Sequence, residues 1–308
     1  MRGNELLDKM ELIDPAYVEA AEAEPKVRKN ILIKWGAVAA CLCLAAIGAM
    51  LWRQPAPILD DDTGLTASEN GVTIPQLNVS LSANEAADME AFFIYQGRCY
   101  VQYEWIYDDS DIVGEYLGTA IGLIDEWTPE EGYVELAGST KGDFYAVKGY
   151  DPSFMLCMKE NGAVTTYICN NGITLKYGSE LYEDRLHLSG SFESVQYESR
   201  NSWYYSRDEY YQLSNDDDMI LDFISDMNSA QFISRDAVPL DEGITYISET
   251  ELYHLFFKMK NGMTVHLRLY ENGYVSFDGI LALCIQVPQE NYNALLNMLD
   301  NSADSAER

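Results

Sequence analysis

The chain has 308 residues, of which 47% are hydrophobic and 12% aromatic, and its formal net charge is −30. This apolar content is enough for a packed core, so global disorder is excluded. Residues 35–308 carry 43 acidic side chains against 14 basic ones. Such a surface repels nucleic acid and anionic lipid headgroups, which excludes nucleic acid as a partner of the large domain.

Residues 1–30 are predicted to form a cytoplasmic amphipathic segment. Asn4 can cap a short helix, and Asp14-Pro15 is a second helix start. The segment is too short to build a core. It is either a frayed approach to the membrane or a helical peptide that docks in a groove of a cytoplasmic protein. In the second case the binding residues would be Leu6, Leu7, Met10, Ile13 and Tyr17.

Residues 31–52 are predicted to form a transmembrane helix. The stretch from Trp35 to Trp52 is uncharged, and at 1.5 Å per residue its length matches the hydrocarbon core of a bilayer. Basic residues gather before it, at Lys26, Arg28, Lys29 and Lys34. The positive-inside rule therefore places the N-terminus in the cytoplasm and the large domain outside the membrane.

Two alternatives remain open for this segment. It could be a cleaved signal peptide, although a leader of about thirty residues is long for one. It could also carry a lipid on Cys41, since Val38-Ala39-Ala40-Cys41 has lipobox-like residue types.

The pattern ELLDKMELIDPAYVEAAEAEP, followed by a basic cluster and KWGAVAACLCL, carries a resemblance. It is similar to the start of poorly characterised single-pass membrane proteins of gut Clostridia. Some of these resemble membrane-bound anti-sigma or regulatory partners of extracytoplasmic-function sigma factors. The resemblance covers residues 5–52 and implies a sigma factor as cytoplasmic partner. Residues 1–34 contain no His or Cys, so the zinc motif of many anti-sigma domains is absent.

Residues 53–88 contain three prolines and few large apolar side chains, which predicts a flexible linker with a short helix from Asn84 to Met89. Two extracytoplasmic units should follow, over 89–212 and 213–301, before a disordered tail at 302–308. In the first unit FFIYQGRCYVQYEWI predicts two strands around Gln96-Gly97, and Asp151-Pro152-Ser153 predicts a turn.

An Asn-Gly pair occurs in four similar places, at 160–162, 170–172, 260–262 and 271–273. Each fits a three-residue hairpin loop with Gly in the left-handed conformation. With such loops at 260–262 and 271–273, the register gives one face that is entirely apolar. That face holds Tyr253, Leu255, Phe257, Val265, Leu267, Leu269, Val275 and Phe277.

Residues 158–178 and 259–279 resemble each other, which is explained either by a duplication or by the general similarity of hairpins. A helix should follow a cap at Ser214 or Asn215, and another should begin after Pro288. The order of strands, helix, strands, helix predicts an α+β fold: antiparallel β-meanders with a few packed helices, which form two related halves if a duplication explains the similarity.

Sequence motifs of common enzymes and cofactor-binding sites are absent, so we expect neither catalysis nor a cofactor. The register places His254, His266 and Arg268 on the polar face of the sheet. They could form a ligand site at the surface, or they could be exposed side chains without a shared role. Acidic clusters such as Asp216 to Asp218 do not match a calcium loop, so no metal site is expected.

Four cysteines lie in apolar strands beyond the linker: Cys99, Cys157, Cys169 and Cys284. An extracytoplasmic location permits disulfides. A three-residue loop at 160–162 would place Cys157 opposite Thr165, with Cys169 too far along the strand for a bridge. Buried free thiols are therefore expected.

The sequence supports two interpretations of function. The chain is either a regulatory or sensory membrane protein that binds an envelope ligand outside and reports to a cytoplasmic partner, or a tethered binding module without a signalling role. Exposed aromatics such as Trp203, Tyr204 and Tyr205 suit the second interpretation.

Overall fold

The computed structural model describes residues 65–76, 91–106, 111–125, 128, 132–160, 162–213 and 217–306. All of them belong to one compact unit, which spans Asp62–Arg308. The predicted cytoplasmic segment and the predicted transmembrane helix at 31–52 lie outside the described residues, as does the predicted helix at Asn84 to Met89. Among the residues that are described, no helix is both long enough and apolar enough to cross a membrane.

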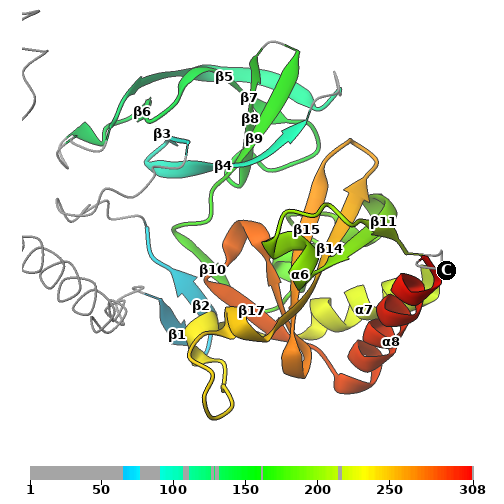
Figure 1. Ribbon diagram of the computed structural model, residues 1–308. Helices are drawn as coiled ribbons and strands as arrows, with labels where there is room; N and C mark the ends of the chain where they lie inside the picture. Colours follow the sequence, from blue (N-terminus) through cyan, green and yellow to red (C-terminus); the bar gives the residue numbers. More distant parts are fainter. Residues whose placement is uncertain are drawn as a thin grey trace, which may run out of the picture. The chain divides into compact units, whose positions relative to one another are not determined.

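The first body of the unit is a closed barrel of seven strands in the order β3-β4-β9-β8-β7-β5-β6 (Figure 1). Its interior is filled by large side chains, among them Phe93, Tyr100 and Phe144. All neighbouring strands are antiparallel except β5 and β6. The strands are β3 Phe92–Tyr95, β4 Arg98–Ile106, β5 Val113–Leu123, β6 Ala137–Gly138, β7 Lys141–Val147, β8 Met155–Glu160 and β9 Ala163–Ile168.

A small sheet of three strands contradicts part of the predicted linker. Strands β1 (Thr66–Ser68) and β2 (Gly71–Ile74) form a hairpin, and β2 also pairs with β10 (Ile173–Leu175). The side chain of Val72 is buried there. Strands of three and four residues are too short to show a recognisable local pattern. The partner that completes the sheet, β10, lies about a hundred residues further along the chain.

The second body is a seven-stranded sheet in the order β12-β11-β14-β15-β16-β17-β13. All neighbouring strands of this sheet are antiparallel. The strands are β11 Phe192–Ser199, β12 Tyr211–Gln212, β13 Phe232–Ser234, β14 Glu251–Met259, β15 Thr264–Tyr270, β16 Tyr274–Phe277 and β17 Leu283–Gln286.

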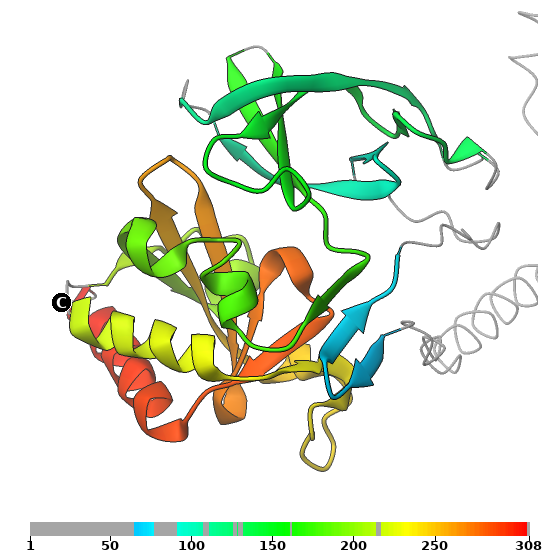
Figure 2. The ribbon, with the colours of Figure 1, turned by 180° about the vertical axis from the view of Figure 1, so that it is seen from behind.

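Two long helices, α7 (Asp217–Ser229) and α8 (Gln289–Ala306), lie side by side on one face of this sheet (Figures 1 and 2). Both were expected from the sequence, although α8 extends to Ala306, into the predicted disordered tail. The short helices are α4 Ser179–Tyr182, α5 Leu188–Ser191, α6 Arg200–Tyr204, η2 Arg235–Ala237, η3 Ile247–Thr250, η4 Glu271–Gly273 and η5 Asp278–Ile280. The α+β class is thus confirmed.

The predicted register of the second body is correct. Leu255 lies opposite Leu267, Leu269 opposite Val275, and the N–H of Met259 donates to the carbonyl of Met263 at 2.8 Å. This closes a three-residue loop, as the apolar pattern required. The apolar face packs into the same core as Phe223 of α7 and Leu295 and Leu299 of α8.

Two of the four predicted hairpin loops are wrong. Glu160 pairs with Ala163, so that loop has two residues, and Cys157 lies opposite Thr166 rather than Thr165. The other wrong loop is the one at 170–172. It does not close a hairpin, because the strand that follows it, β10, pairs with β2 of the small sheet. The predicted turn of two residues at Gln96-Gly97 is correct, with φ of 52° and 68°.

The predicted boundary between residues 212 and 213 passes between strands of one sheet. β11 and β12 precede it, yet β11 pairs with β14 from Phe192 to Ser199. The two similar segments, 158–178 and 259–279, also have different surroundings. The first runs from the barrel into the small sheet, whereas the second stays within one sheet. Their similarity therefore does not extend to topology.

The four cysteines of the folded unit are free and buried, as expected. Burial raises the pKa of the Cys99, Cys157 and Cys284 thiols to about 12. Thiols with such a high pKa are unreactive at neutral pH.

Candidate functional site

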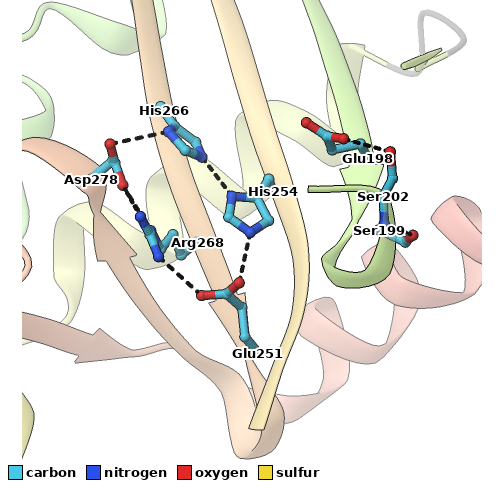
Figure 3. Close-up of polar contacts among 8 residues, drawn as sticks. All are labelled: Glu198, Ser199, Ser202, Glu251, His254, His266, Arg268 and Asp278. Carbon is cyan, nitrogen blue, oxygen red and sulfur yellow. Dashed lines mark hydrogen bonds and ion pairs between the residues drawn. The ribbon is translucent and has the colours of Figure 1, made fainter. Parts of the chain in front are cut away.

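Five side chains form a closed ring of hydrogen bonds and ion pairs on the sheet face opposite α7 and α8 (Figure 3). His254 Nε2 lies 2.7 Å from Glu251 Oε1, and His254 Nδ1 lies 2.7 Å from His266 Nε2. His266 Nδ1 lies 3.3 Å from Asp278 Oδ2. Arg268 closes the ring, with Nη2 2.6 Å from Asp278 Oδ1 and Nη1 3.3 Å from Glu251 Oε2.

A β-bulge brings Glu251 into this ring. In a regular strand Glu251 and His254 would point to opposite faces. The register of β14 against β15 shifts between Glu251 and Tyr253, and the extra residue reverses the alternation. Glu251 therefore shares a face with His254.

Asp278 enters the ring through the register of β16. Phe277 lies opposite Leu267, so the next residue, Asp278, is beside His266. The turn η5 begins at this position and ends the strand. The ring thus combines side chains from β14, β15 and the end of β16.

The charges of the ring stabilise one another. Burial alone would raise the pKa of Glu251, but the hydrogen bond and charge of His254 and the charge of Arg268 lower it. The pKa of Asp278 is lowered well below its usual range, because the interactions with His266 and Arg268 outweigh its burial. Burial lowers the pKa of His266, although the hydrogen bond and charge of Asp278 oppose the effect.

Aromatic rings cover the two histidines. The indole of Trp203 stacks on His254 with centroids 4.6 Å apart and an interplanar angle of 20°. Phe256 stacks on His266 at 4.6 Å. Trp203 belongs to α6, whose start is fixed by the side chain of Ser199, which accepts a hydrogen bond from the N–H of Ser202 at 3.2 Å.

A second buried pair lies next to the ring. Glu198 on β11 is directly opposite His254 in the sheet register, and both residues are buried. Ser202 Oγ donates a hydrogen bond to Glu198 Oε2 at 2.6 Å (Figure 3). The pair ties α6, and with it Trp203, to the sheet.

A cavity of about 440 Å³ lies above the ring. This volume is within the usual range for small-molecule sites. Two members of the ring, His266 and Asp278, line it, and the rest of its wall is part aromatic and part charged. The other lining residues are Tyr103, Glu104, Gln196, Trp203, Tyr210, Phe256, Lys258 and Thr264.

Side chains of barrel strand β4 complete the cavity by capping a free sheet edge. Thr264 and His266 precede the stretch of β15 that pairs with β16. The hydroxyl of Tyr103 donates to the carbonyl of Thr264 at 2.8 Å and accepts from the N–H of His266 at 3.2 Å. Glu104 Oε2 accepts from the N–H of Thr264 at 2.7 Å. A bulge in β4 between Gln102 and Glu104 leaves Tyr103 without a partner on β9 and directs it at this edge.

Two carboxylates, Glu104 and Asp278, and one ammonium group, Lys258, line this cavity, and Asp278 is already paired with Arg268 in the ring. Burial raises the pKa of Glu104, although the hydrogen bonds from Thr264 and the charge of Lys258 oppose the effect. Lys258 Nζ donates to Thr264 Oγ1 at 3.1 Å, which leaves two of its three donors for other partners.

The structure brings His254, His266 and Arg268 together, as the register predicted. Their predicted position at the surface is wrong for the histidines, since His254 is 0% exposed and His266 is 7% exposed. Local alternation could not show that α6 covers them. Leu6, Leu7, Met10, Ile13 and Tyr17, the predicted partner-binding residues, lie outside the described residues.

Sequence reasoning missed Glu251, Asp278 and Trp203 as members of the site. Extending the register by one residue beyond Phe277 would have found Asp278. Nothing in the local pattern indicates the bulge that includes Glu251. Trp203 is 38% exposed, and Tyr204 and Tyr205 are much more exposed, at 70% and 63%.

The ring does not resemble a metal centre, because each imidazole nitrogen already faces another ring member. Within the described part of the chain, no three His, Cys, Asp or Glu side chains are placed to hold a metal ion. No protein-family model matches the chain, and comparisons with curated proteins and with solved structures found no match.

Proposed function

We propose that the chain is a membrane-anchored regulatory or sensory protein whose folded unit binds a small ligand in the cavity above the His254–His266 ring. The cavity itself carries this proposal: a volume of about 440 Å³ with aromatic walls and a few convergent polar groups. Pockets of this composition are the usual sites of small-molecule binding.

The groups around the cavity favour a ligand with both charges. Glu104 can accept hydrogen bonds from a cationic group, and Lys258 can donate to an anionic one. Trp203, Phe256 and Tyr210 offer apolar area beside these two groups. A free amino acid or a short peptide has this combination of ammonium, carboxylate and side chain.

Binding suits the ring better than catalysis does. Each imidazole nitrogen of His254 and His266 and each oxygen of Glu251 and Asp278 faces another ring member. A general base needs a free nitrogen within hydrogen-bond reach of a substrate. The ring instead supports a rigid floor beneath the ligand.

The anchor and the signalling role rest on the sequence of residues 1–52. The basic cluster before Trp35 supports a cytoplasmic N-terminus. A tethered binding module would use the same cavity, so the two interpretations differ only in the need for residues 1–34. Affinity purification with a 1–34 peptide separates them: a specific cytoplasmic partner, such as a sigma factor, supports signalling, and recovery of none supports the module.

Thermal shift measurements on the full-length chain in detergent test the cavity, with each of the twenty free L-amino acids as probe. A ligand at one hundred times its dissociation constant stabilises a protein by about 2.7 kcal/mol, a shift of roughly 5–10 °C for a domain of this size. We expect at least one amino acid to give such a shift. Its N-acetylated and amidated derivatives should give less, since each lacks one charge.

Variants locate the effect. Glu104→Gln keeps an acceptor for the N–H of Thr264 but removes the charge, and Trp203→Ala removes the aromatic wall. Both should abolish the shift, whereas Tyr116→Ala, a change at a half-exposed side chain on β5, should not. The proposal fails if none of the twenty probes shifts the melting temperature, or if the shift survives both cavity variants.

A further inference from the structure

The hydrogen-bonded ring has a fixed supply of donors. Arg268 can only donate, and it donates to Glu251 on one side and to Asp278 on the other. Ionised carboxylates can only accept. Each carboxylate therefore also accepts from the imidazole that it faces.

These two acceptors determine where the imidazole protons lie. His254 Nε2 must carry a proton for Glu251, and His266 Nδ1 must carry one for Asp278. A neutral imidazole has only one N–H. Two neutral histidines would then direct lone pairs at each other across the 2.7 Å contact between His254 Nδ1 and His266 Nε2.

We propose that the His254–His266 pair is a proton-binding site, which holds one proton more than two neutral imidazoles carry and places it in the contact between the two rings. The pair is then singly positive, and with Arg268 it balances the two carboxylates, so the buried ring has no net charge. This inference rests on the ring geometry and is independent of the ligand proposed for the cavity.

The extra charge belongs to His254. Imidazole is more basic than a carboxylate, so the proton stays on the pair. Charge-assisted hydrogen bonds are the shorter ones, and His254 Nε2 lies 2.7 Å from Glu251 Oε1 whereas His266 Nδ1 lies 3.3 Å from Asp278 Oδ2, which assigns the second proton to His254. His254 as imidazolium donates to both Glu251 and His266, and His266 is the neutral Nδ1–H form. Among the other titratable groups, Glu198 lies opposite His254 on β11, whereas Glu104 and Lys258 line the cavity beside His266.

Amide substitutions give this inference a distinctive test. In Asp278→Asn the amide oxygen can accept from Arg268, while its NH₂ donates to His266 Nδ1. His266 Nε2 then donates to His254 Nδ1, and no extra proton is needed. Glu251→Gln acts in the same way from the other end. With both amides present, His254 Nε2 and His266 Nδ1 each accept a hydrogen bond from an amide NH₂. The one N–H of each neutral ring is then on the inner nitrogen, and the two N–H groups clash in the contact between His254 Nδ1 and His266 Nε2.

The measurement is the ¹⁵N spectrum of the full-length chain with labelled histidine. The chain has three histidines, and His187, whose Nε2 lies 3.1 Å from the carbonyl of Gly149, serves as an internal control. At neutral pH we expect two protonated nitrogens on His254 and one on His266, at Nδ1. Either single amide variant should convert His254 to the one-proton form. A neutral His254 in the unsubstituted chain overturns the inference, and so does a charged His254 in both single variants.

Stability provides a second readout that does not depend on spectral assignment. Because each single amide preserves the ring, its unfolding midpoint should stay near that of the unsubstituted chain. The double variant should lose more than the two single losses combined. A double loss equal to that combination would contradict the inference. Should the double variant fail to fold while both single variants do fold, that result is the expected non-additivity in its extreme form.

Discussion

The phenol of Tyr103 provides a sharp test of how the barrel and the seven-stranded sheet support the site. Tyr103→Phe removes one oxygen and nothing else. That oxygen donates to the carbonyl of Thr264 and accepts from the N–H of His266, and both backbone groups lie on the edge of β15 that has no strand partner. Since Thr264 and His266 are buried, water does not readily replace the oxygen.

The expected loss follows from these two bonds. A buried donor or acceptor without a partner costs about 1–3 kcal/mol, so the substitution should destabilise the chain by about 2–4 kcal/mol. For a domain of this size that corresponds to a fall of roughly 5–15 °C in melting temperature. The carbonyl of Thr264 and the N–H of His266 would be left without these partners.

Circular dichroism during thermal and urea unfolding of the full-length chain measures this loss. Tyr116→Phe is the matched control, because its hydroxyl bonds Thr119 Oγ1 at 2.8 Å on a side chain that is 54% exposed. Its effect should stay below about 0.5 kcal/mol, as for most surface substitutions. A Tyr103→Phe variant as stable as the Tyr116→Phe control would refute the role assigned to this edge.

Three further results are expected. Phe257→Ala, at a fully buried position of the apolar face, should cost about 3–5 kcal/mol in urea unfolding, and a loss below about 1 kcal/mol would contradict the assigned core. The stability contributed by the histidine pair should peak near pH 6.5. Relative to two neutral imidazoles, the folded pair keeps one extra proton, whereas the unfolded pair carries no extra proton well above that pH and two well below it. The free energy of unfolding that the pair contributes therefore falls by up to about 1.4 kcal/mol per pH unit on either side. The lowered pKa of His266 accounts for the acid side. The folded pair of Asp278→Asn holds no extra proton, so the titration of the unfolded histidines cancels when its profile is subtracted, and the remaining difference in stability should fall steadily as the pH rises through about 6.5. A difference that does not change with pH would contradict the extra proton. Cys99, Cys157, Cys169 and Cys284 should resist iodoacetamide near neutral pH until the chain is unfolded, because burial raises the pKa of each thiol; modification of any of them in the folded chain, located by peptide mass spectrometry, would count against this burial.

The hairpins of the second body were predictable because their information is local. A three-residue loop at 260–262 is the choice that keeps Leu255, Phe257 and Leu267 on one face, and a shift by one residue would have exposed them. The loop at 160–162 lacks this constraint. Its flanking residues include threonines on both faces, so the apolar pattern did not distinguish a loop of two residues from one of three.

The pairing of strands that lie far apart in the chain could not be predicted from the sequence. The strand of Gly71–Ile74 has only four residues, which is too short a pattern to be recognised without its partner β10. Likewise, the sequence places residues 192–199 in the first predicted unit, because nothing near them indicates pairing with β14, which begins more than fifty residues later.

The candidate site was half predictable for the same reason. Strand alternation grouped His254, His266 and Arg268, and extending the same register by one residue beyond Phe277 would have added Asp278. Glu251 depends on a bulge, and bulges change which face a side chain occupies without a clear local signal. The cover provided by Trp203 depends on tertiary packing, so the burial of the histidines could not be derived from their strand.

The central claim is that a proton joins His254 to His266 within a closed ring. The most direct measurement is the two-bond ¹⁵N–¹⁵N scalar coupling across this hydrogen bond in the full-length, histidine-labelled chain at neutral pH. We predict a resolved coupling between His254 Nδ1 and His266 Nε2, which disappears when either ring is replaced by asparagine. Two uncoupled nitrogens in a chain that is otherwise folded would contradict the account.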